Sequence, residues 1–134
     1  MKNIIFKCIE SQCHDQQFDV NHLIMALNFS YTYLRELTYK YYSQSPRELI
    51  ESIRLASTFK YIDSNLPLEV ICIKCGFGNY KTFRTAFEKR LGISAAKARV
   101  ALCRINNKEV LVNKWQQQIW SKGRTPLVTK EIDI

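Results

Sequence analysis

The sequence predicts an all-α fold. Apolar residues recur at helical spacing along most of the 134 residues, and the alternation typical of strands is rare. Only three prolines and four glycines interrupt the chain, and a hydrophobic content of 46% is enough for a buried core. Two segments, Leu23–Leu37 and Ile71–Phe87, share one plan, in which a short apolar helix and a tight corner precede a second helix with one apolar face. The sequence therefore predicts two helix-turn-helix subdomains joined by a long linker helix, a homeodomain-like tandem repeat.

Residues 1–44 are expected to form the first helix-turn-helix lobe. Asp19 and Ser30 can each accept a hydrogen bond from a free backbone N–H group, so each is placed to cap a helix. The apolar positions that are expected to face inward on its three helices are Ile4, Ile5, Cys8 and Ile9, then Val20, Leu23, Ile24 and Leu27, then Tyr33, Leu34 and Leu37.

Residues 45–66 are expected to form the linker helix. Ser45 is placed to cap it, and Pro46 follows in the first turn, where proline is favoured because no backbone donor is needed there. The apolar positions that predict a long helix are Leu49, Ile50, Ile53 and Tyr61.

Residues 67–105 are expected to form the second lobe. Pro67 begins a short helix, Gly76 ends it, and Asn79 and Ser94 are placed to cap the next two helices. The apolar positions expected inward on these three helices are Val70, Ile71 and Cys72, then Phe83 and Phe87, then Val100 and Leu102.

Residues 106–134 are expected to form a C-terminal extension. Leu111, Trp115 and Ile119 recur at a spacing of four, which indicates one amphipathic helix, although Val110–Val112 is also compatible with a short strand. The rest of the extension is expected to be a mobile basic tail, with a DNA minor-groove arm at Gly123–Pro126 as the alternative.

Positive charge is concentrated in the second half of the chain. Residues 1–66 contain seven Lys/Arg and seven Asp/Glu, whereas residues 67–134 contain thirteen and five, so the whole net charge of +8 lies there. This asymmetry favours an anionic partner, nucleic acid before membrane, over a basic face that only meets solvent. No apolar run approaches the ~20 residues that span a bilayer. Five cysteines match no disulfide framework, and the N-terminus has no secretory signal, so a cytoplasmic protein is expected.

The second repeat combines an isoleucine-rich helix, a Gly76-Phe77 corner, a helix capped by Asn79 and a closing Gly92. In this combination the chain, over about residues 4–102, resembles the DNA-binding domain of AraC/XylS-type bacterial transcription regulators. The other matching positions are Leu23, Ser30, Leu34, Ser45, Pro46, Arg54, Leu55, Pro67, Leu68, Val70, Ile71, Cys72, Phe83 and Phe87. The chain departs from the family pattern at Ile24, Thr38, Ser43, Thr58, Ala95 and Ala98.

The resemblance implies a sequence-specific transcription regulator that binds double-stranded DNA, an activator that inserts two recognition helices into adjacent major grooves. The length is similar to that of single-domain members that act as monomers on DNA, with RNA polymerase as a further partner. An excised domain of a larger regulator is the alternative. The rival hypothesis is a protein-interaction module, a helix-turn-helix relic that binds another regulator or RNA polymerase in place of DNA.

Family positions imply which residues contact DNA. The base-contacting candidates are Tyr31, Thr32, Arg35 and Glu36 in the first recognition helix and Tyr80, Lys81, Arg84 and Thr85 in the second, and Lys89 and Arg90 are further candidates for phosphate contact. Arg35 and Arg84 could each bond to guanine through two N–H groups, or contact phosphate or solvent. Glu36 could accept a hydrogen bond from cytosine, or pair with Lys40 one helical turn away.

Cysteine and histidine residues indicate no metal, no cofactor and no catalytic centre. Cys72 and Cys75 form a CxxC, but no second CxxC or histidine pair supplies the remaining ligands of a zinc site. Both are expected to be core thiols, and Cys13 is expected to be the most exposed thiol. His14 and His22 are the only histidines, and neither adjoins a nucleophile or phosphate-loop motif, so the protein is not expected to be an enzyme.

Overall fold

Eight α-helices form the part of the chain that the structure, a computed structural model, describes, namely residues 2–120. They are α1 (Lys2–Gln12), α2 (Val20–Leu27), α3 (Tyr31–Tyr42), α4 (Pro46–Thr58), α5 (Leu68–Lys74), α6 (Tyr80–Leu91), α7 (Ala95–Arg104) and α8 (Lys108–Trp120). No strand occurs within this range, so the prediction of an all-α fold is confirmed. None of these eight helices is both long and apolar enough to cross a lipid bilayer.

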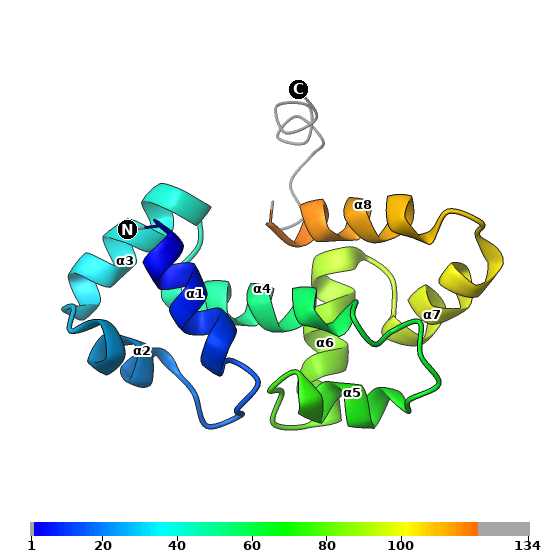
Figure 1. Ribbon diagram of the computed structural model, residues 1–134, viewed down its shortest axis with the longest axis horizontal. Helices are drawn as coiled ribbons and strands as arrows, with labels where there is room; N and C mark the ends of the chain where they lie inside the picture. The colour runs from blue at the N-terminus through cyan, green and yellow to red at the C-terminus, as the bar shows by residue number, and fades with distance from the viewer. Residues whose placement is uncertain (1, 121–134) are drawn as a thin grey trace.

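The helices form two lobes on either side of α4 (Figure 1). The helices α1, α2 and α3 form one lobe, and α5, α6 and α7 form the other. Within the lobes, α2 and α3 form the first helix-turn-helix unit, and α5 and α6 form the second. The two recognition helices are therefore α3 and α6.

Five polar residues begin helices in the manner that the sequence predicts. The side chains of Asp19, Ser30, Ser45, Asn79 and Ser94 each accept a hydrogen bond from the backbone N–H three residues later, at 2.8–3.2 Å. Each bond satisfies a donor that has no partner inside its helix. The caps therefore fix where both recognition helices begin.

Left-handed backbone conformations form the corners. Asn28 ends α2 with φ of 58°, and Gly76, just after α5, has φ of 92°. Glycine is required at position 76 for a second reason, because a Cβ atom there would overlap the carbonyl oxygen of Cys13 in the other lobe. The two lobes therefore touch directly at this corner.

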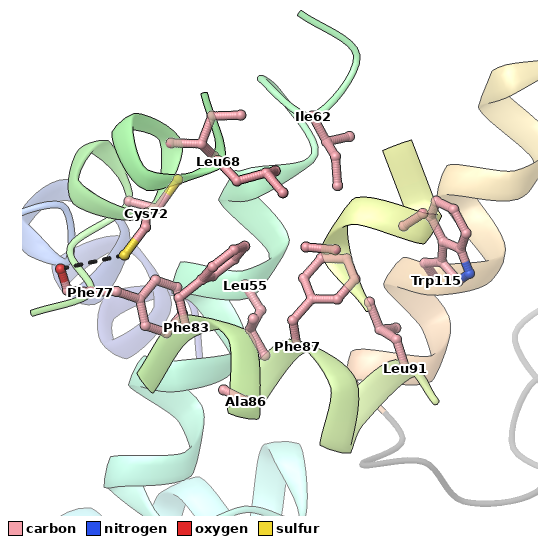
Figure 2. Packing of buried hydrophobic residues seen from close by; sticks show 14 of the residues in the cluster. Leu55, Ile62, Leu68, Cys72, Phe77, Phe83, Ala86, Phe87, Leu91 and Trp115 are labelled. Atoms are coloured by element: carbon pink, nitrogen blue, oxygen red, sulfur yellow. Dashed lines mark hydrogen bonds between the residues drawn. The ribbon is translucent and has the colours of Figure 1, made fainter. Parts of the chain in front are cut away.

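The linker α4 belongs to both hydrophobic cores. Leu49, Ile50 and Ile53 are buried in the core of the first lobe, while Leu55 is buried in the core of the second. Figure 2 shows Leu55 lying close to Phe83, one of the buried aromatic residues of α6. Because one rigid helix supplies side chains to both cores, neither lobe can rotate about α4 without exposing apolar surface.

Two expected elements differ from the structure. The linker helix ends at Thr58, and Tyr61 lies in the turns that follow, so residues 45–66 do not form one continuous helix. The possible strand at Val110–Val112 is wrong, because these residues lie in α8.

The helix α4 is a short rod. Its thirteen residues, at a rise of about 1.5 Å each, give a length of about 20 Å.

Several residues expected to face inward lie at the edge of an apolar stripe and remain exposed. They are Ile4, Tyr33, Val70 and Val100. The apolar face of a helix is wider than the strip that its neighbours cover, so a residue at the margin of the pattern reaches solvent. Their immediate neighbours Ile5, Leu34 and Ile71 are fully buried.

The amphipathic helix expected in the C-terminal extension is α8, and it contacts both lobes. Trp115 stacks on Phe59 with ring centroids 5.8 Å apart, next to the core of the second lobe. The ring centroid of Trp120 lies 5.8 Å from that of Phe6 in α1 and 6.1 Å from that of Tyr42 in α3. Thus α8 braces the junction between the lobes.

The mobile tail and the minor-groove arm that the sequence suggests fall on residues 121–134, outside the described range.

Candidate nucleic-acid interface

The outer face of α3 presents all four candidates of the first recognition helix to solvent. Tyr31, Thr32, Arg35 and Glu36 are exposed, and together with Tyr39 they line an open concavity along the helix. Burial of the apolar positions on the opposite side of α3 fixes this orientation. A groove lined by a single helix is too open to enclose a small molecule, and its shape suits contact with a second surface.

The Arg35 guanidinium is held on the helix surface by an aromatic ring. Its Cζ atom lies 4.9 Å from the centroid of the Tyr39 ring, within the range of a cation–π contact. No ion pair within residues 2–120 joins Glu36 to Lys40, and the Lys40 ammonium lies over the Tyr41 ring instead, 5.3 Å from its centroid. The carboxylate of Glu36 is therefore left on the outer face, beside Arg35.

The outer face of α6 is more basic. Lys81, Arg84, Thr85 and Lys89 are all exposed. They point outward because Phe83 and Phe87, on the opposite face of the helix, are fully buried, as Figure 2 shows.

Tyr80 lies between the surface and the core. It is half-buried, and its ring centroid lies 6.1 Å from that of Phe83. The expectation that Tyr80 faces outward therefore holds only for part of its surface. With Arg84, Glu88 and the start of α7, it lines a shallow depression on the outer side of α6.

Arg90 is the clearest correction to the expected interface. Its side chain is only 6% exposed, although it was expected to contact phosphate. It donates hydrogen bonds to the Ser52 hydroxyl at 2.8 Å and to the carbonyl oxygens of Glu48 and Ile119 at 3.3 Å each, and it pairs with Glu51 at 3.0 Å. Arg90 thus joins α6 to α4 and α8, and cannot reach DNA in this fold.

The sequence contains a signal for this burial. Phe83, Phe87 and Arg90 follow one another at i, i+4 and i+7, which places Arg90 on the apolar face of α6. Two further arginines serve the fold in the same way. Arg54 donates to the carbonyl oxygens of residues 13, 15 and 18 at 2.8–3.0 Å, and Arg99 donates to that of Ile62 at 2.9 Å.

A cleft between the lobes contains an arginine that sequence analysis passed over. Arg47, in the first turn of α4, is exposed and lines the cleft with Asn21 of α2 and Thr82 of α6. The cleft therefore opens beside the first turn of the second recognition helix. Helical spacing places Arg47 one turn before Glu51 and two turns before Arg54, on a face that could have been recognised as polar.

Cysteine burial is partly as expected. Cys72 and Cys75 are buried, which confirms that they are core thiols, and burial raises the pKa of each. Cys13 was expected to be the most exposed thiol, but it is buried in the core of the first lobe, and Cys103 is exposed instead. No cluster of three metal-binding side chains occurs within residues 2–120.

Comparison with known proteins agrees with this architecture. Residues 23–100 match the family model described as a helix-turn-helix domain. The fold is similar to that of the C-terminal domain of AraT, a response regulator from Geobacillus stearothermophilus, with a TM-score of 0.69 at 22% sequence identity, covering 74% of this chain and 83% of that chain. No curated protein sequence matches the chain. The matched residues include both recognition helices and the linker between them, and the chain belongs to the AraC-type helix-turn-helix family of DNA-binding transcription regulators.

Proposed function

We propose that this protein is a sequence-specific regulator that binds double-stranded DNA with α3 and α6 in adjacent major grooves, and that it acts as an activator. The observation that carries the proposal is that both recognition helices are capped, oriented by buried residues, and exposed along their outer faces. Because one chain supplies both helices, we propose that it binds its site as a monomer, and that the site is asymmetric.

The dimensions support two contacts on one face of the duplex. Successive major grooves are about 34 Å apart. The α4 rod is about 20 Å long, and helices pack against each other at axial distances of about 8–10 Å. The length of the α4 rod together with these packing distances is therefore comparable to the separation of the two grooves. Any shortfall would bend the DNA, at a cost of about 1–6 kcal/mol for a bend of some tens of degrees.

Charge divides the work between the helices. The exposed charged residues of α6 are Lys81, Arg84 and Lys89 against Glu88, whereas those of α3 are Arg35 and Lys40 against Glu36, so α6 is the more basic helix. We therefore propose that the second lobe supplies most of the affinity through phosphate contacts, and that the first lobe adds selectivity. Arg47 is added to the phosphate-contacting candidates in place of Arg90.

An activator requires contact with the transcription machinery, so RNA polymerase is proposed as a second partner. Selection from a random-sequence DNA pool, followed by titration with salt, tests the proposal. Enrichment of a two-part asymmetric motif, with affinity that falls steeply with salt, is the expected result. Binding without enrichment would contradict sequence specificity, and no binding at low salt would favour the protein-interaction module.

A further inference from the structure

Three polar side chains form a buried chain of hydrogen bonds between the lobes. Gln44 and Ser52 are fully buried, and Arg90 nearly so. The Ser52 hydroxyl donates to Oε1 of Gln44 at 2.5 Å and accepts from Nη1 of Arg90 at 2.8 Å. Such a chain is cooperative, because each bond orients the group that makes the next one.

These hydrogen bonds connect the C-terminal ends of the two recognition helices. Gln44 follows Ser43, which ends α3; Ser52 lies at the middle of α4; and Arg90 lies in the last turn of α6. In the view of Figure 1, α3 and α6 both run toward the side of the molecule on which α8 lies. Their N-terminal parts belong to separate cores, with Leu34 in one and Phe83 in the other.

The bonds leave little freedom at the junction. Within residues 2–120, Nε2 of the buried Gln44 has no hydrogen-bond partner, so the bond from Ser52 is the one that holds this amide. At the other end, the planar guanidinium of Arg90 is held by Glu51 of α4 and by the carbonyl oxygen of Ile119 in α8. A guanidinium bonded on several sides fixes direction as well as distance.

Stability alone does not account for such a chain. Apolar side chains of similar volume often stabilise a buried site as well as polar ones do, but they impose weaker directional constraints. We infer that Gln44, Ser52 and Arg90 are positioning residues that set the angle and separation of α3 and α6, and thereby the spacing of the two parts of the DNA site. This inference rests on the proposed function.

Substitution of the middle link tests the inference with little change in shape. Ser52→Ala removes only a hydroxyl from a helix that favours alanine. Thr58→Val is the matched control, because Thr58 is a fully buried α4 residue whose hydroxyl donates to the carbonyl oxygen of Leu55 in the same helix. Gln44→Leu breaks the same link from the other end and leaves the bonds of Arg90 intact. It replaces Ser52→Ala if that variant does not fold.

The first measurement compares the dissociation constants for the selected DNA site and for versions with one base pair added or removed between its parts. One base pair moves the second groove by about 3.4 Å and turns it by roughly 35°. For the wild type and Thr58→Val we expect a loss on the order of tenfold, equivalent to one bidentate base contact. For Ser52→Ala we expect the loss to shrink to about threefold or less. An unchanged loss in Ser52→Ala would overturn the inference while leaving the proposed function intact.

The second measurement requires no DNA. Residual dipolar couplings of the free protein report the orientation of one lobe relative to the other. We expect the same orientation in the wild type and Thr58→Val and an altered one in Ser52→Ala, where α4 still joins the two cores but the side-chain hydrogen bonds no longer set their angle. An unaltered orientation in Ser52→Ala overturns the inference, whereas a wild type that binds no DNA at all overturns the proposed function.

Discussion

Replacing Arg90 with methionine should destabilise the fold and leave the salt dependence of DNA binding unchanged, while Lys89→Met should do the reverse. The two residues are neighbours in the last turn of α6 and each substitution removes one positive charge. They differ in environment, because Lys89 is exposed and Arg90 is buried between α4 and α8. Comparison of the two variants therefore distinguishes a residue that stabilises the fold from a residue that contacts DNA within one helical turn.

The structure sets the expected size of the Arg90→Met effect. Hydrogen bonds to charged groups contribute about 1.5–3 kcal/mol each, and breaking a fully buried ion pair costs about 3–5 kcal/mol. Two of the three hydrogen bonds of Arg90 are long, at 3.3 Å, and its partner Glu51 is 39% exposed, so the freed carboxylate regains water. Methionine also keeps much of the apolar stem. We expect a loss of about 2–3 kcal/mol, or a Tm lowered by on the order of 10 °C.

Urea unfolding followed by circular dichroism measures the first effect, and fluorescence anisotropy on a duplex between 50 and 200 mM salt measures the second. Lys89→Met should change the stability by less than about 0.5 kcal/mol. It should make the negative slope of log K against log salt shallower by about 0.9, which corresponds to the loss of one phosphate contact. If Arg90→Met kept the wild-type urea midpoint and lowered the salt slope as Lys89→Met does, Arg90 would be a DNA contact and its assignment to the fold would be refuted.

Three further predictions concern the interface and the periphery of the fold. Arg84→Ala should lower affinity and salt slope more than Arg35→Ala, and Arg35→Ala should mainly relax base selectivity, as binding to a panel of site variants would show; equal losses with equal slopes would reject the division of labour. Under native conditions an aromatic disulfide reagent should modify Cys103 well before Cys13, whose burial raises its pKa, and mass spectrometry of the peptides would reveal the opposite order. The helix-capping hydrogen bond lowers the pKa of Asp19 below its ordinary value of 3.8. The bond should therefore stabilise the fold fully above pH 3.8, and this stabilisation should disappear as the pH falls through the lowered pKa. Asp19→Ala should differ from the wild type in urea midpoint at pH 6 and converge with it in strong acid.

Features that depend on a few neighbouring residues were predictable. The caps at Ser30 and Asn79 and the corner at Gly76 require only local chemistry, and the structure confirms all three. The exposure of the outer faces of α3 and α6 follows from the same periodicity, because the buried apolar residues of each helix determine which residues face outward.

Features that depend on packing between distant segments were not predictable. Helical spacing places Arg90 on the apolar face of α6, but the acceptors that allow a guanidinium to be buried there come from α4 and α8, whose positions the local pattern does not give. Cys13 is buried in the core of the first lobe, and the Gly76 corner of the second lobe lies against its carbonyl oxygen. The linker ends at Thr58 although apolar residues recur at helical spacing as far as Tyr61, since turns continue this spacing without continuing the helix.

Chemical footprinting of guanine N7 on the selected DNA site tests the simultaneous use of both recognition helices most directly, because N7 is accessible only in the major groove. Two protected regions about 10 base pairs apart on one face of the duplex are expected. Arg35→Ala should remove protection from one region and Arg84→Ala from the other. A single protected region, abolished by Arg84→Ala and unaffected by Arg35→Ala, would contradict the insertion of two helices.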